Sequence, residues 1–435
     1  MKITPFQGIL FGVFVITALA GLFVFATYTN KNSGDVSVGS VVIWGTLPSD
    51  SMQSMLTTLT QTDTDLKSVS YVQKDPATLP TDLASAIATG AAPDLVLDSQ
   101  ENLFSLARFI MPIPVETLSA STFSNAFVQG AVVFTAAGGY YGVPFLVDPL
   151  VLFANRSILS SSGIARPPET WESLVGLVPG IVRITPSRQV ARSLIALGSY
   201  NNVTNARGIL SSLFLQTDIP ISSYAANGVL SADLGARGTA SHGVPAGQAV
   251  LGFYTQFADP TKVSYTWNGS LKGSQQSFLS GDLALYLGYA SEARFLREAN
   301  PNLNFTVAPF PQPATASARN VYGLIYAFMI PRGAKNSAGA YQVAATLSNT
   351  AEQSVAAGAT GLAPASLTVL GGAPADPVAG IAYPEALYTR GWLSPAPAST
   401  DAVFSGMIGN VISGRSTLPI ALTSAASSLT DLLQQ

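Results

Sequence analysis

Four acidic side chains stand where the sequence predicts strands to end or to be interrupted. Asp98 and Glu101 follow one short apolar run, Asp148 falls inside a second, and Glu292 follows a third. An ionised carboxylate accepts strong hydrogen bonds from ligand hydroxyl or ammonium groups. Asp98 and Asp148 could also form the acid pair of a glycosidase, which needs two carboxyls about 5 to 10 Å apart. The alternative for each acid is structural, because such positions also suit helix or turn caps.

Aromatic residues stand near the same predicted strand ends or in Gly- and Ser-rich loops. They are Trp44, Trp267, Tyr289, Tyr322 and Trp392. Flat rings can stack on the apolar face of a sugar or on a cation. Together with the acids they would line a pocket in which polar groups orient the ligand and rings supply contact area. Each ring could instead be a packing residue of a core.

The composition excludes several classes of chemistry. The 435-residue chain has no cysteine and one histidine, His242, so disulfides, thiolate metal sites and histidine-dependent triads are not expected. A net charge of -3 without a Lys/Arg cluster argues against nucleic acid as a partner. No nucleophile elbow, phosphate-binding loop, metalloprotease motif or dinucleotide fingerprint occurs. We therefore expect a protein that is not an enzyme, with no catalytic residue, metal or cofactor.

The first part of the chain alternates short apolar runs with amphipathic segments. Strands are predicted at 41–46, 69–73 and 94–98, and helices at 50–60, 81–89 and 101–109. This alternation is typical of a parallel doubly wound sheet, in which ligands bind beyond the carboxyl ends of the strands. Farther along, helices are predicted at 188–200 and 206–215, and a strand at 282–288.

The apolar run 143–153 is interrupted by Asp148-Pro149, and both residue types are poor in the middle of a central strand. We therefore interpret this stretch as a strand that is broken where the chain passes from one packed body to another. The apolar segment 322–330, which begins at Tyr322, would bring the chain back.

Residues 8–28 form an uncharged apolar run that is long enough to span a bilayer as a helix. Lys2 before the run favours a cytoplasmic N-terminus, with the rest of the chain outside the cell membrane. A signal peptide cleaved near Ala18-Leu19-Ala20 is the alternative, although the apolar run continues well past that point. We expect a single-pass anchor within 1–29, a linker at 30–40 and an extracytoplasmic body.

Several motifs resemble the solute-binding proteins of bacterial ABC importers, of the type that includes maltose-binding protein. They are YGVPFLVDPLVLFAN followed by SGIARPPETWESL, ATGAAPDLVLDSQENLFSLA, and FLSGDLALYLGYASE followed by NFTVAPFPQP. Paired helices that close on the turn Gly361-Leu-Ala-Pro364, and two terminal helices, complete the resemblance. It spans roughly residues 41 to 433, and the order of the motifs makes it more specific than any one of them.

The resemblance implies an α/β, two-lobed periplasmic-binding-protein-like fold of type II, preceded by one N-terminal transmembrane helix. Lobe 1 would comprise 41–147 plus 324–368, and lobe 2 would comprise 148–323 plus 369–435. Asp148 would then lie on the floor of the cleft between the lobes, and Tyr289 in an aromatic position over the ligand.

The function that the resemblance implies is capture of a small solute by hinge closure, for delivery to ABC permease subunits. Several aromatics and few charges favour a carbohydrate, whereas the four acids keep a polyamine as the second ligand class. The chain would act as a monomer, held near its permease by the N-terminal helix. An exported glycoside hydrolase and a sensory ectodomain without a permease are the other interpretations left open.

Overall fold

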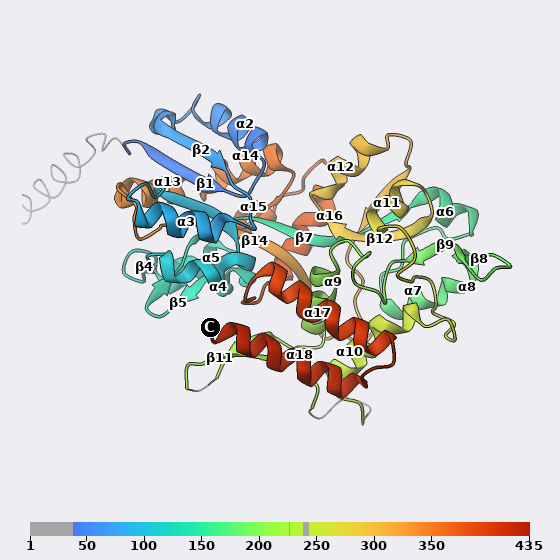
Figure 1. Ribbon diagram of the computed structural model, residues 1–435. Helices are drawn as coiled ribbons and strands as arrows, with labels where there is room; N and C mark the ends of the chain where they lie inside the picture. The colour runs from blue at the N-terminus through green and yellow to red at the C-terminus, as the bar shows by residue number, and fades with distance from the viewer. Residues whose placement is uncertain (1–37, 226, 238–242) are drawn as a thin grey trace, which may run out of the picture.

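A computed structural model of the chain describes residues 38–435, with the exception of 226 and 238–242. Within these residues two lobes lie side by side, joined where strands β7 (Val143–Asn155) and β14 (Val321–Met329) run past each other (Figure 1). The predicted membrane anchor and most of the linker lie outside the described residues. No helix in the described part of the chain is long and apolar enough to cross a membrane.

One sheet passes through both lobes, with its main strands in the order β2-β1-β3-β14-β7-β12-β9-β8. Strand β1 pairs in parallel with β2 and β3, as the alternation of the sequence predicts, while β14 runs antiparallel to β3 and β7. The other strands of this sheet are β1 (Val41–Gly45), β2 (Val69–Gln73), β3 (Leu95–Ser99), β8 (Arg183–Ile184), β9 (Val190–Ile195), β12 (Leu283–Tyr289), β13 (Phe305–Ala308), β15 (Ala363–Pro364) and β16 (Thr389–Arg390). Two smaller sheets contain β4 (Ile113–Pro114), β5 (Thr135–Ala136) and β6 (Gly139–Tyr140), and β10 (Ile221–Tyr224) with β11 (Leu230–Asp233).

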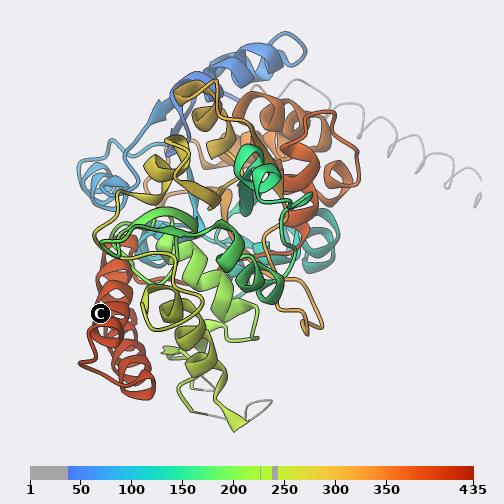
Figure 2. The same cartoon turned by 90° about the vertical axis from the view of Figure 1, so that its right-hand side faces the viewer.

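Helices pack on the sheet in both lobes, and the two terminal helices lie side by side along the second lobe, red in Figures 1 and 2. The helices that precede β7 or follow β14 are α2 (Ser49–Leu59), α3 (Leu79–Ala88), α4 (Leu103–Leu106), α5 (Ala120–Ala126), α13 (Ser337–Leu347), α14 (Thr350–Thr360), α15 (Leu367–Leu370), α16 (Ala379–Leu387), α17 (Pro397–Ile412) and α18 (Leu418–Leu433). Those between β7 and β14 are α6 (Arg156–Ser161), α7 (Trp171–Gly176), α8 (Val178–Ile181), α9 (Ala206–Leu215), α10 (Ala246–Thr255), α11 (Ser274–Leu279) and α12 (Glu292–Ala299).

Strand β7 is continuous, so the predicted break at Asp148-Pro149 is wrong. All 13 of its residues are buried. Its partners change at this point, because residues 143–149 pair with β14 whereas residues 150–154 pair with β12. A proline removes one backbone donor, and that loss matters least where the strand passes from one partner to the next. The chain therefore crosses between the lobes without leaving the sheet.

The segment 188–200 is also not the helix that its pattern predicts. Residues 190–195 form strand β9, which pairs in parallel with β12. Leu194 and Ile195 are fully buried there. A short apolar run fits a strand or a helix equally well by itself, and here the open edge of β12 decides between them. The neighbouring helix α9 and strand β12 form close to where the sequence predicts them.

The close approach of β14 to β7 can be tested at Gly323. A Cβ atom there would lie 2.8 Å from the carbonyl oxygen of Asp148 and 2.9 Å from Cα of Pro149. Backbone atoms cannot move aside easily, so Gly323→Ala should lower the free energy of unfolding by about 1–3 kcal/mol. Urea denaturation of the variant and the wild type measures this.

Gly358→Ala is the matched control, because nothing lies within 4 Å of a Cβ at this position of α14. Alanine at a helical glycine should leave the urea midpoint unchanged or raise it. If both alanine variants had the same midpoint, the tight crossing of β7 and β14 would be refuted.

Candidate functional site

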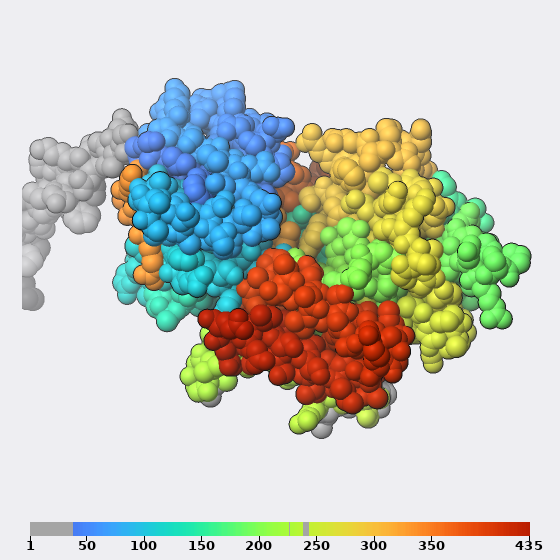
Figure 3. All heavy atoms as spheres, viewed as in Figure 1, coloured from blue at the N-terminus to red at the C-terminus, as the bar shows by residue number. Residues whose placement is uncertain are grey.

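A cleft lies between the lobes, where the carboxyl ends of β1, β3 and β12 face one another. Figure 3 shows it as a hollow between the blue lobe and the yellow and orange lobe. Two cavities of about 500 and 390 Å³ occupy the cleft. Both volumes lie in the range of small-molecule sites, which is roughly 300–1,000 Å³.

The larger of these two cavities joins lobe 1 to helices of lobe 2. Glu101 and Leu324 line it from the side of β3 and β14. The remaining lining residues come from the α9 region, from the end of β12 and from α17: Tyr200, Asn201, Val203, Asn205, Ala206, Arg207, Gly208, Tyr289 and Asp401.

Glu101 is held on both of its carboxylate oxygens. Its Oε1 accepts hydrogen bonds from Nε of Arg207 at 3.0 Å and from the hydroxyl of Tyr322 at 2.7 Å. Its Oε2 accepts from a terminal nitrogen of Arg207 at 2.8 Å. This is a bidentate arginine–carboxylate pair, which is the strongest common geometry for such a contact.

Arg207 continues the network into lobe 2. Its other terminal nitrogen donates to Asp401 at 2.5 Å, and the hydroxyl of Tyr200 donates to the same carboxylate at 2.6 Å. Burial by itself lowers the pKa of Arg207, but the charge of Glu101 and the hydrogen bonds to it outweigh burial and raise the pKa. The guanidinium therefore remains charged and neutralises part of the acid in this cavity.

The smaller cavity lies at the other end of the cleft. The loop after β1 lines it from lobe 1, and the start of α12 lines it from lobe 2, with Asp148 and Tyr326 between them. Asp148 is only 3% exposed, and it accepts from the backbone nitrogen and the hydroxyl of Ser291 at 3.1 and 2.6 Å. Burial raises the pKa of Asp148 to about 7, although these bonds oppose the shift.

Asp98 fixes the ends of β1 and β3 to each other and is 1% exposed. It accepts hydrogen bonds from Thr46 Oγ1, from the backbone nitrogen of Ser99 and from Nδ2 of Asn102, all at 2.8–2.9 Å. Burial raises its pKa to about 6. Both carboxylate oxygens of Asp98 are therefore hydrogen-bonded within the protein, as its structural alternative predicts.

Glu292 has a similar structural role in lobe 2. It accepts from the backbone nitrogen of Tyr289 at 2.8 Å and from side chains of Asn205, Gln275 and Tyr286 at 2.5–2.7 Å. These bonds hold the turn after β12, and Glu292 thereby orients Tyr289.

Tyr289 is the aromatic residue that the structure places in the cleft. It is partly buried and lines the larger cavity. Burial raises its pKa well above the usual value, and the nearby charges of Glu101 and Asp148 add to the shift. Tyr289 is thus close enough to both Glu101 and Asp148 to feel their charges.

The other aromatic candidates do not line these cavities. Trp44 stacks against Lys74, whose Nζ lies 3.8 Å from the ring centroid. Trp267 is 1% exposed and donates to Asn202, so it is a core residue. Tyr322 is equally buried and acts on the cleft through its bond to Glu101.

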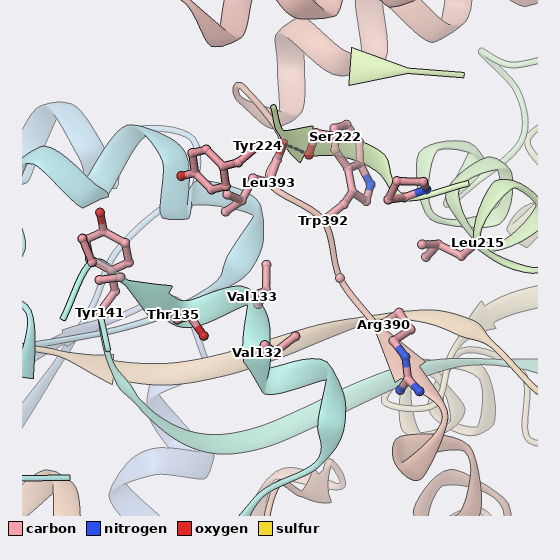
Figure 4. Close-up of a pocket in the computed structure, with 14 residues that line it drawn as sticks. Val132, Val133, Thr135, Tyr141, Leu215, Ser222, Tyr224, Arg390, Trp392 and Leu393 are labelled. Atoms are coloured by element: carbon pink, nitrogen blue, oxygen red, sulfur yellow. Dashed lines mark hydrogen bonds between the residues drawn. The ribbon is translucent and has the colours of Figure 1, made fainter. Parts of the chain in front are cut away.

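Trp392 lines a different cavity, of about 700 Å³, away from the acids. Figure 4 shows Trp392 and Leu393 opposite Val132, Val133 and Tyr141. The indole nitrogen donates to Ser211 at 3.1 Å, and the residue is 3% exposed. This position suits packing between the segment around β16 and the second lobe.

Arg207, Asp401 and Tyr200 were not among the residues singled out from the sequence. One signal was present, since Arg207 is the only charged residue in the ten-residue apolar helix α9. A lone arginine at the start of such a helix must find partners. Asp401 carries no comparable signal, because its role depends on contacts 194 and 201 residues away in the chain.

The residues that the structure describes contain no cluster of three or more His, Cys, Asp or Glu side chains that could hold a metal ion. The carboxylates of Asp98 and Asp148, the acid pair singled out from the sequence, each accept hydrogen bonds from protein donors.

Comparison with protein families gives one match: the model of the bacterial extracellular solute-binding protein family matches residues 56–380. A search of curated proteins gave no match.

Solved structures of binding proteins share the fold at low sequence identity. A cyclo/maltodextrin-binding protein in complex with maltotetraose is 15% identical, with a TM-score of 0.70 over 91% of this chain and 97% of that one. A cyclic α-maltosyl-1,6-maltose binding protein from Arthrobacter globiformis is 14% identical, with a TM-score of 0.73 over 91% and 99%. An ABC transporter solute-binding protein from Thermotoga lettingae bound to α-D-tagatose is 17% identical, with a TM-score of 0.66 over 91% and 100%.

The buried acids predict an unusual dependence of stability on pH. Asp148 and Asp98 have folded-state pKa values of about 7 and 6, against 3.8 for the free side chain. The folded protein therefore binds these protons more tightly, and this contribution to stability is complete below about pH 4 and lost as the pH rises towards 7. Asp148→Asn is neutral throughout, so its urea midpoint should fall less between pH 4 and 7 than that of the wild type.

Asp259→Asn is the control for that measurement. Hydrogen bonds from Thr261 lower the pKa of the exposed Asp259, so this group affects stability only below about pH 4. Its variant should keep the wild-type slope from pH 4 to 7. An equal slope for Asp148→Asn and the wild type would mean that Asp148 is ionised in the folded protein.

Proposed function

The chain belongs to the bacterial extracellular solute-binding protein family, and we propose that it captures a carbohydrate in the cleft between its lobes. The lobes would close on the ligand by bending at β7 and β14, and the closed form would then dock on an ABC permease. The observation that carries this proposal is the larger cleft cavity, in which a tyrosine ring lies beside paired charges from both lobes.

A neutral sugar fits this cavity better than a polyamine does. A polycation needs carboxylates with free oxygens, yet the carboxylates of Glu101, Asp148 and Glu292 already accept bonds from protein donors. Arg207 places a fixed positive charge in the same cavity and would repel an ammonium group. A neutral sugar avoids this repulsion, its hydroxyls can both donate and accept hydrogen bonds, and the Tyr289 ring offers an apolar face.

A glycosidase mechanism is the weaker proposal, even though burial raises the pKa of both Asp98 and Asp148. A general acid must reach the glycosidic oxygen, and a nucleophile or base must reach the anomeric carbon or a water. Asp98 and Asp148 are 1% and 3% exposed and are bonded within the protein. The structures with the same fold described above are also binding proteins.

The way in which the lobes are connected supports hinge closure. Hinges are a few residues that absorb a change of backbone angles while two packed bodies move as units. The change of strand partners at Pro149 is such a place, since neither β14 nor β12 restrains both sides of it. We further propose that the N-terminal segment keeps the binding lobes close to the permease in the membrane, which raises the effective concentration of the loaded form.

The proposal predicts that a neutral oligosaccharide raises the melting temperature of the full-length chain and that spermidine does not. A panel of maltotriose, maltotetraose, mannotriose, tagatose and spermidine tests this by thermal shift, followed by calorimetry. Removing the ring with Tyr289→Ala should weaken binding at least about tenfold, which corresponds to about 1.4 kcal/mol.

Tyr224→Ala serves as the control, because Tyr224 is 63% exposed and lies outside the cleft cavities. It should bind the sugar with wild-type affinity. A shift with spermidine and none with any sugar would instead establish a polyamine-binding protein.

A further inference from the structure

One ion pair connects the lobes directly across the cleft. Glu101 lies in the short turn Gln100–Asn102 that follows β3 in lobe 1, and Arg207 lies in the first turn of α9 in lobe 2. Two hydrogen bonds, of 3.0 and 2.8 Å, join them directly. The two lobes are therefore in polar contact at this end of the cleft.

The pair is largely shielded from water. The side chains of Arg207 and Glu101 are 18% and 12% exposed. Such a pair is screened by salt less than a surface pair, and its loss leaves a charge without a partner in a poorly hydrated site. Each partner is also braced within the protein, Glu101 by Tyr322 and Arg207 by Asp401, so the two groups are held in position for each other.

A second contact joins the same end of the cleft. The hydroxyl of Ser105 in α4 donates to the carbonyl of Pro395, close to the start of α17, at 3.0 Å. In Figure 3 the red segment that contains α17 lies directly beneath the blue lobe. Lobe 1 thus meets both α9 and the approach to α17 near Arg207.

The opposite end of the cleft has no such bond. There Arg294 and Asp50 line the smaller cavity from the two lobes. Arg294 pairs with Glu298 on its own helix at 2.8 Å, and both of these side chains are mostly exposed. In the described residues, no ion pair links the loop after β1 to α12. An ion pair therefore joins the two lobes only at the end of the cleft that contains Arg207, among the residues that the structure describes.

We propose that the Glu101–Arg207 pair is a latch that holds the lobes together at one end of the cleft in the ligand-free protein. The lobes then separate from the Arg294 end, which is where a ligand enters. The ligand completes a closure that is already partly formed, so the latch raises apparent affinity by enriching the binding-competent form. The role of the latch in affinity rests on the proposed function, whereas its effect on the ligand-free protein does not.

The distance between the lobes in the ligand-free chain tests the latch. The chain has no cysteine, so Thr57→Cys on α2 and Gln276→Cys on α11 give one exposed spin-label site in each lobe. Double electron–electron resonance on the full-length chain then reports the distribution of distances between the labels. In Glu101→Gln and in Arg207→Gln, the population with a longer distance should grow about tenfold relative to the wild type.

Two further variants distinguish the loss of the Glu101–Arg207 pair from a general loss of folded structure. Asp401→Asn removes the second negative charge beside Arg207 but leaves the Glu101–Arg207 pair, so it should keep most of the wild-type distribution. Arg207→Lys keeps the charge without the bidentate geometry and should give an intermediate distribution. Circular dichroism of each variant establishes that it is folded.

Wild-type distances in both folded glutamine variants would overturn the latch and leave sugar capture untouched. If neither glutamine variant folds, Arg207→Lys decides, because lysine keeps the positive charge but cannot form the bidentate pair with Glu101. A shift to longer distances in Arg207→Lys supports the latch, and a wild-type distribution overturns it. The sugar panel described above tests the proposed function separately, since it measures ligand binding and not the ligand-free distance.

Discussion

The continuity of strand β7 is the constraint on which the rest of the structure depends. One buried strand pairs with β14 before Pro149 and with β12 after it. Strand β7 thereby belongs to both halves of the sheet. As a result, the carboxyl ends of β3 and β12 face each other. Because the lobes share this strand and little else of the sheet, they can move as bodies while the sites at the strand ends stay intact.

Most of the acidic side chains near the cleft accept hydrogen bonds from the protein itself. Asp98 and Glu292 fix the loops at the ends of β3 and β12, and Asp148 holds the turn at Ser291. Glu101 alone reaches across the cleft, where it meets Arg207. In a chain with only 10% charged residues, this pairing leaves a polar cavity whose arginine is bonded to the acids on both sides of it. Such a cavity suits a ligand with many hydroxyls and no net charge.

The sequence was sufficient for features set by local pattern and order. It predicted the parallel start of the sheet, helix α9, strand β12 and the position of Tyr289 at a strand end. The helix predicted at residues 188–200 was wrong, because part of this segment pairs as a strand with the edge of β12. The predicted break at Pro149 was also wrong, because the strand changes pairing partners there and so loses little from the missing backbone donor. Arg207 and Asp401 could not be paired with their partners, because those contacts join residues 106 and 194 positions apart.

The most direct test of a cleft that shuts on a sugar is small-angle X-ray scattering of the full-length chain, with and without a saturating oligosaccharide. Closure at β7 and β14 brings the lobes together, so the radius of gyration should fall as the sugar binds and should level off when binding is complete. A sugar that binds to saturation while the radius of gyration stays constant would contradict hinge closure between the lobes.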